Sequence, residues 1–147
     1  MNAMTLSLRV TASEPAARVS AGRRQFTVGR PVEFDEASPH VAALEYALGA
    51  VGGELVNGVR EFARRRRVTI DAVEALVTGE LSNGLTYLEV IGERGEPSLS
   101  RISVKVFVST PDPGSARTLF GQMLERLPLV CTLRRALDLQ IELVLTT

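Results

Sequence analysis

Hydrophobic and polar residues alternate in several short stretches of this chain, the pattern of a strand with one buried face. The first stretch, Thr5 to Ala12, alternates Leu6, Leu8 and Val10 with polar side chains, and it predicts a half-buried strand. The same reasoning predicts further strands at Ala17–Ala21, Gln25–Val28, Ala72–Leu81, Arg101–Ser109 and Leu139–Leu145. Residues typical of turns follow these strands: Gly22-Arg23-Arg24 separates the second and third strands, and Ser82-Asn83-Gly84 follows the strand that ends at Leu81.

The stretch from His40 to about Arg67 has helical periodicity instead. One stripe consists of large apolar residues: Leu44, Leu48, Val51, Leu55, Val59 and Phe62. A second stripe beside it has small residues and one carboxylate: Ala43, Ala47, Ala50, Glu54 and Gly58. Four internal glycines each cost such a helix about 1 kcal/mol relative to alanine. Because a helix accepts that cost where another backbone comes close, we expect a central helix packed on more than one side.

The remaining segments complete an α+β order. Pro111 to Ser115 opens a helix with Ser115 as its N-cap, and Val130–Ala136 forms a second short helix. Leu85–Glu96 reads as a short helical turn followed by a loop. The order βββ-α-ββ-αα-β predicts a single α+β domain over residues 1–147, with an antiparallel sheet packed on the central helix. Residues 1–4 are expected to be a disordered leader or a cloning remnant.

Composition narrows the functional classes. Seventeen basic residues balance seventeen acidic ones, so no net charge favours nucleic acid or an anionic membrane. The four arginines Arg64–Arg67 are interpreted as a solvated cluster at a helix C-terminus. Apolar runs are too short to span a bilayer, and a signal-peptide pattern is missing, so a cytoplasmic location is the default expectation. His40 is the only histidine and Cys131 the only cysteine, so neither a metal motif nor an intrachain disulfide is expected, and no cofactor is predicted.

Two short stretches stand out: Ala43 to Glu54 reads ALEYALGAVGGE, and Leu127 to Leu133 reads LPLVCTL. They resemble motifs of the osmotically inducible protein C (OsmC) and organic hydroperoxide resistance (Ohr) family. The central helix of that family typically reads P-x-E-L-L-L-x-A-L-G-G-C, and here Ala43 to Glu54 reads ALEYALGAVGGE. Glu45 matches the glutamate of the motif, and Glu54 stands where the cysteine would be. Near the C-terminus the family carries C-P-V-x-x-T-L, whereas this chain reads LPLVCTL, with Leu127 at the cysteine position.

The resemblance implies an OsmC-like fold and an intertwined homodimer in which two long helices lie antiparallel at the centre. Active members reduce organic peroxides with two cysteines per site, and both positions are replaced here. An arginine near the early strands reaches the reactive cysteine in family members. Arg18 is the nearest match, with Arg23, Arg24 and Arg30 as rivals.

Glu54 and Cys131 are the candidate chemical groups. Glu54 is interpreted either as a desolvated general acid, base or ligand anchor, or as a structural carboxylate that accepts from an arginine or a backbone donor. We expect it to be largely buried and bonded to a donor, with an arginine from either chain the leading candidate. Glu45 lies about 180° round a straight helix from Glu54 and is not expected to pair with it. Cys131 is either a small core residue or a lone thiol resolved by an external reductant.

The sequence therefore predicts a degenerate OsmC-like homodimer related to peroxide-stress proteins but without their two-cysteine chemistry. Its predicted role is to bind a small hydrophobic ligand, or to act structurally, at a site that includes Glu54, Glu45, Arg18 and Leu127. The alternatives are a one-cysteine organic hydroperoxide reductase using Cys131, or an acid–base enzyme using Glu54.

Overall fold

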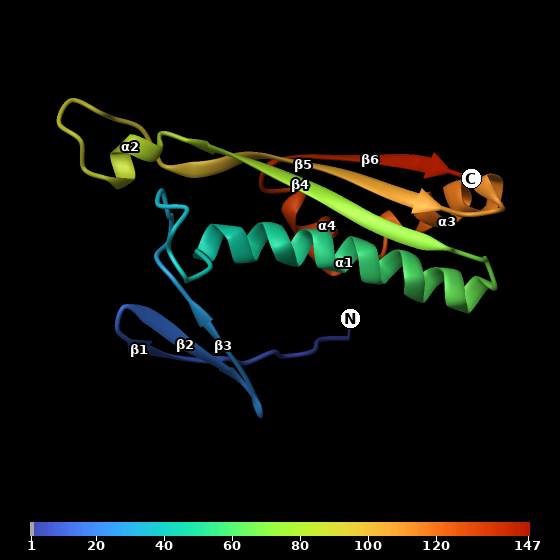
Figure 1. Ribbon diagram of the computed structural model, residues 1–147, viewed down its shortest axis with the longest axis horizontal. Helices are drawn as coiled ribbons and strands as arrows, with labels where there is room; N and C mark the ends of the chain where they lie inside the picture. Colours follow the sequence, from blue (N-terminus) through green and yellow to red (C-terminus); the bar gives the residue numbers. More distant parts are fainter. Residues whose placement is uncertain (1) are drawn as a thin grey trace. The chain divides into compact units, whose positions relative to one another are not determined.

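The computed structural model describes residues 2–147, so Met1 of the expected leader lies outside the described residues. The chain forms two compact units, one ending at Ala47 and one beginning at Leu48 (Figure 1). The boundary falls inside the long helix α1 (Ala43–Arg66), whose first turn belongs to the first unit. The element order agrees with the predicted α+β order, and the short helical turn predicted between the fourth and fifth strands is present.

The first unit is an antiparallel meander of β1 (Arg9–Ser13), β2 (Ala16–Ala21) and β3 (Arg24–Val28). Gly22, at φ 64°, makes the turn between β2 and β3 as predicted. The first strand is shorter than the predicted Thr5–Ala12, because β2 ends opposite Arg9 and turns back, so the residues before Arg9 have no strand to pair with in this sheet. Leu6 and Leu8 are 89% and 60% exposed, so the alternating pattern is present without a buried face in the single chain.

The second unit contains a three-stranded sheet in the order β4-β5-β6, formed by β4 (Ala72–Ser82), β5 (Ser98–Ser109) and β6 (Asp138–Thr146). The antiparallel pair β4–β5 confirms part of the prediction. β6, however, runs parallel to β5, which corrects the expectation of a purely antiparallel sheet. The reason is the intervening pair of helices, which carries the chain back to the starting end of β5 before β6 begins.

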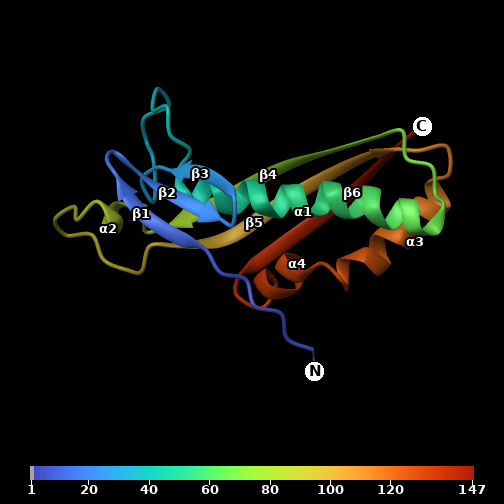
Figure 2. The same ribbon diagram turned by 90° about the horizontal axis from the view of Figure 1, so that it is seen from below.

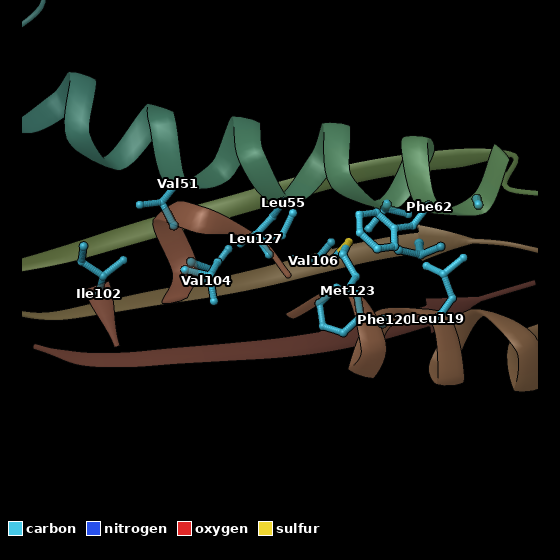
Figure 3. Close-up of a cluster of buried hydrophobic side chains, with 14 residues drawn as sticks. Val51, Leu55, Phe62, Ile102, Val104, Val106, Leu119, Phe120, Met123 and Leu127 are labelled. Carbon is cyan, nitrogen blue, oxygen red and sulfur yellow. The ribbon is translucent and has the colours of Figure 1, made fainter. Parts of the chain in front are cut away.

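Three helices cover one face of this sheet: α1, α3 (Pro113–Leu124) and α4 (Pro128–Leu133) (Figures 1 and 2). Every second residue of β5 is buried beneath them, from Ile102 to Val108. Figure 3 shows Leu55 and Phe62 of α1 above this strand, with Met123 and Leu119 of α3 beside it. The alternation of β5 and the large-residue stripe of α1 therefore meet in one core, as their periods predicted.

Within the single chain, the buried residues of helix α1 lie on one side, and the expectation that it packs on more than one side stays a prediction that depends on the dimer. These buried residues are Val51, Gly52, Leu55, Gly58, Val59, Phe62 and Ala63. Gly52 and Gly58 are needed there, because an added Cβ would lie 2.8 Å from Val77 and 3.0 Å from Leu127 respectively. The exposed side of α1 carries small residues: Ala43, Ala47, Gly49, Ala50, Gly53 and Asn57.

Local corrections concern the helix ends. Helix α1 begins at Ala43 rather than at His40, and α4 spans Pro128–Leu133 instead of Val130–Ala136. The N-cap of α3 is Asp112, whose carboxylate accepts from the Ser115 backbone amide at 3.1 Å, so Ser115 is the capped residue and not the cap. A hydrogen bond with the Ser115 side chain, followed by this bond from the Ser115 backbone amide, lowers the pKa of Asp112. The predicted short helical turn is α2 (Gly84–Tyr87), and none of the helices in residues 2–147 is long and apolar enough to cross a membrane.

Candidate functional site at the junction of α1 and α4

The start of α4 leaves backbone donors without partners in its own helix. The first amides of any helix have no carbonyl four residues earlier to receive them, and a side chain at the N-cap usually accepts them. In α4 the N-cap residue is Leu127, which makes no side-chain capping bond, and Pro128 at the first helical position has no N–H to satisfy. The amides of Leu129 and Val130 therefore need an acceptor from elsewhere in the chain.

Glu54 of α1 is that acceptor. Its Oε2 accepts from the Leu129 amide at 2.8 Å, and its Oε1 accepts from the Val130 amide at 2.9 Å. One carboxylate thus receives two consecutive backbone amides and places a negative charge at the positive end of a helix, both of which are favourable. The structure answers why a stretch rich in glycine and alanine carries this carboxylate: it ties α1 to α4 across 75 residues of sequence.

Two expectations about Glu54 are corrected by this geometry. Its donors are backbone amides of the same chain, not the arginine predicted to pair with it. Its side chain is also only partly buried, whereas the sequence predicted that it would be largely buried.

Leu127 makes the second contact across this junction. It is 6% exposed, and its methyl carbons lie 3.0 and 3.3 Å from the place where Gly58 would carry a Cβ. Figure 3 shows it between Leu55 on α1 and Val104 on β5. The position that the resemblance assigns to a second cysteine is therefore filled by a core side chain, held close to the helix by a glycine.

Cys131 lies in α4, one residue after the amide of Val130. The thiol is partly buried, and its Sγ makes a weak contact with the Leu124 carbonyl oxygen at 3.8 Å. Arg134, three residues further on, is engaged by Glu125 at 3.2 Å. The hydrogen bonding that Arg134 donates to the Glu125 carboxylate is the main cause that raises the pKa of Arg134, followed by the charges of Glu125 and Cys131. The guanidinium is therefore shared with a carboxylate and is not dedicated to the thiol.

The remaining predicted site residues lie in the first unit. Glu45 Oε1 accepts from the Ala42 amide at 3.0 Å, so this glutamate closes the N-terminus of α1 in the manner of a capping box. Arg18 is exposed in the middle of β2, opposite Thr11 and Thr27. The structure does not bring Glu45 and Glu54 to a shared partner, which agrees with their expected separation around α1.

Comparison with known proteins gives a fold. No family model matches this chain, and no curated protein matches its sequence. Among solved structures, an OsmC-like protein from Mycoplasma pneumoniae superposes with a TM-score of 0.79, covering 98% of this chain and 99% of its own at 16% identity. The chain has the OsmC-like fold.

Further structures support this assignment. An organic hydroperoxide resistance protein OsmC from Legionella pneumophila matches with a TM-score of 0.70 at 10% identity, covering 98% of this chain and 99% of its own. The organic hydroperoxide resistance protein OhrB of Bacillus subtilis matches with a TM-score of 0.60 at 17% identity, covering 95% and 98% respectively. At these identities the OsmC-like fold is shared while the residues that fill its sites are free to differ.

The junction suits a structural role better than a chemical one. Both oxygens of Glu54 already accept from backbone amides, so protonation of the carboxylate would weaken the bonds that support α4. The sequence reading missed Leu129 and Val130 as the partners of Glu54. One signal was available: Pro128 predicts a first helical position, and the leucine before it cannot cap, so α4 required an acceptor from another element.

Proposed function

We propose that this chain is an OsmC-like homodimer in which the former thiol site has become a structural junction, so that the protein works as a binding or structural module. The observation that carries the proposal is the paired hydrogen bonding of Glu54 to the Leu129 and Val130 amides, at 2.8 and 2.9 Å. A carboxylate cannot be oxidised and re-reduced as a thiol can, and here it also holds α4 in place. The single-chain fold and the comparisons support peroxide-stress ancestry for the fold, and the proposed role departs from it at this junction.

The proposed dimer rests on apolar surface that one chain leaves open. The exposed small-residue side of α1 would let a second helix approach closely. This would explain the glycines at positions 49 and 53, where an added Cβ would meet no described atom of the single chain within 4 Å. The alternating residues Leu6, Leu8 and Val10 are likewise at least 60% exposed. A small hydrophobic ligand, if one is bound, would then be held where the two copies meet.

The native protein is expected to have about twice the 15.9 kDa mass of one chain when measured by light scattering at micromolar concentration. Gly53→Leu should shift it towards the monomer, because a bulky side chain would separate the two α1 helices. The matched control is Gly121→Leu on α3, where an added side chain also meets nothing within 4 Å. A monomeric native protein, or equal behaviour of the two variants, would contradict the proposed α1 pairing.

Thiol-dependent turnover of organic peroxides is expected to be no greater than that of a Cys131→Ser variant. In the one-cysteine alternative, the Cys131 thiolate would attack the peroxide, release an alcohol and become a sulfenic acid, which two equivalents of external thiol would reduce. Cumene hydroperoxide with dithiothreitol as reductant is a direct assay. Turnover that disappears in Cys131→Ser would replace the proposed function with this alternative.

A further inference from the structure

The segment between β4 and β5 exposes an unusual amount of apolar surface. We call residues 85–91 the apolar loop: within these seven positions five large side chains are exposed. They are Leu85, Tyr87, Leu88, Val90 and Ile91, and the last of these is 100% exposed. The loop projects past the ends of β4 and β5 with α2 at its base (Figure 1). Clustered exposed apolar side chains of this kind mark an interaction surface more often than an idle one.

Backbone hydrogen bonds hold the apolar loop in a defined shape. The Val90 amide donates to the Leu85 carbonyl at 3.2 Å, and the Glu93 amide donates to Val90 at 3.1 Å. At its base, the Asn83 side-chain amide donates to the Glu96 carbonyl at 3.0 Å. A loop that is already ordered loses little conformational entropy when it binds, so its exposed side chains can contribute fully to a contact.

The charges near the apolar loop restrict its partner. Glu89, Glu93 and Glu96 outnumber Arg94, so the loop and the residues that follow it are acidic. An anionic lipid surface would repel this excess of negative charge, because membranes attract basic segments. The chemistry fits a protein surface with an apolar centre and a basic rim.

The chain itself carries such a surface. A depression of about 300 Å³ between the second half of α1 and the start of β4 is lined by Val56, Arg60, Ile70, Asp71, Ala72 and Val73. Three of these residues have branched aliphatic side chains, and Arg60 is exposed. The exposed arginines Arg64–Arg67 follow at the C-terminal end of α1. Arg94, three residues after the apolar loop, offers a counter-charge for Asp71. The occupant that matches the apolar loop is therefore a second copy of this chain.

The positions of the two surfaces suit a two-fold arrangement. Gly79 of β4 lies against Leu48, since a Cβ on the glycine would be 2.9 Å from a Leu48 methyl carbon, and the apolar loop begins six residues later. The depression instead surrounds Arg60, about 18 Å further along α1 at about 1.5 Å per residue. Two copies paired through antiparallel α1 helices would bring the loop end of each towards the Arg60 end of the other.

We propose that the apolar loop of each copy docks in the Val56–Val73 depression of the other, so that the contact occurs twice per dimer. This proposal rests on the homodimer proposed above and adds a second pair of contacts between its two copies. It assigns Val90 and Ile91 as the apolar anchors and the arginines of α1 as the cationic rim.

Site-directed cross-linking tests the contact. In a Cys131→Ser background, which contains no other cysteine, Val90→Cys is combined with Ala72→Cys, and the protein is treated with a short bis-maleimide. Both positions are exposed, and Ile91 is kept as the anchor. We expect a covalent dimer in denaturing electrophoresis. The matched control replaces Ala72→Cys by Gln140→Cys, which is exposed on β6 at the opposite edge of the sheet, and should give no covalent dimer.

A second measurement leaves Cys131 unchanged and uses no cross-linker. Ile91→Ser should raise the dimer dissociation constant at least about tenfold in sedimentation equilibrium, because anchor residues dominate interfaces and the loop acts twice. Leu76→Ser is the control: it removes a 60% exposed leucine from the outer face of the sheet and should leave the dimer dissociation constant unchanged. A native dimer that neither cross-links through Val90→Cys nor weakens in Ile91→Ser would overturn the loop contact and leave the dimer intact. A native monomer would instead overturn the homodimer on which the contact rests.

Discussion

Replacing Leu127 by alanine is expected to lower the free energy of unfolding by about 3–4 kcal/mol, which is within the range for a leucine-to-alanine change that creates a cavity in a core. Leu127 is 6% exposed and rests on Gly58, so its removal leaves space between α1 and the start of α4. Neighbouring side chains cannot easily fill that space, because the backbones on both sides belong to helices. Chemical denaturation monitored by circular dichroism would measure the change.

The control for this prediction is Leu76→Ala on β4. Leu76 is 60% exposed on the outer face of the sheet, so its truncation should change the free energy of unfolding by about 0.5 kcal/mol or less. If both variants lose the same stability, Leu127 would not be the core contact described here. A much larger loss of stability in Leu127→Ala would instead indicate that Leu127, at the position where the family motif has a cysteine, is part of the core.

The sequence predicted best those elements in which the periodic pattern extends over many residues and only one side is buried. β5 alternates strictly from Ile102 to Val108 and packs on α1, whose large-residue stripe repeats every three or four residues. Both patterns are local, and burial follows them directly. The glycine at position 58 could be seen as a close-approach residue, but only the fold shows that Leu127 is what approaches it.

Features that depend on two distant segments were less accessible. β6 alternates as a strand should, yet its parallel pairing with β5 depends on the path of α3 and α4, which alternation does not encode. Leu6 and Leu8 show a different mismatch. Their alternation predicts a buried face, yet both side chains are exposed within residues 2–147.

The partner of Glu54 illustrates the same limit at the candidate site. A carboxylate among small residues predicts a donor, and an arginine is the usual one, but backbone amides carry no side-chain signal in a sequence. The need for an acceptor could be seen instead at α4, which begins at Leu127 and Pro128 without a capping side chain. A search for helices that lack a cap, matched against unexplained carboxylates elsewhere, would have paired the two.

Removing the Glu54 carboxylate is expected to destabilise the protein through α4. Glu54→Ala leaves the amides of Leu129 and Val130 without their acceptors and should cost about 2–3 kcal/mol, since bonds to a charged acceptor are worth more than neutral ones. Glu54→Gln keeps one acceptor but turns its amide group towards the other backbone N–H, so an intermediate loss of about 1–2 kcal/mol is expected. Thermal melts should therefore order the native protein, the glutamine variant and the alanine variant from most to least stable.

The order of these three melting temperatures separates capping from other roles of the carboxylate. Glu61→Gln is the matched control, because Glu61 is a carboxylate on the same helix whose partners, Arg64 and Arg65, are exposed surface arginines. Its removal should shift the melting temperature little, since exposed ion pairs contribute weakly. If Glu54→Ala behaved like Glu61→Gln, the two amides of α4 would be satisfied by water and the junction would not depend on Glu54. If Glu54→Gln instead lost as much stability as Glu54→Ala, an ionised partner such as the arginine first expected would be indicated, because both variants would leave that cation unpaired.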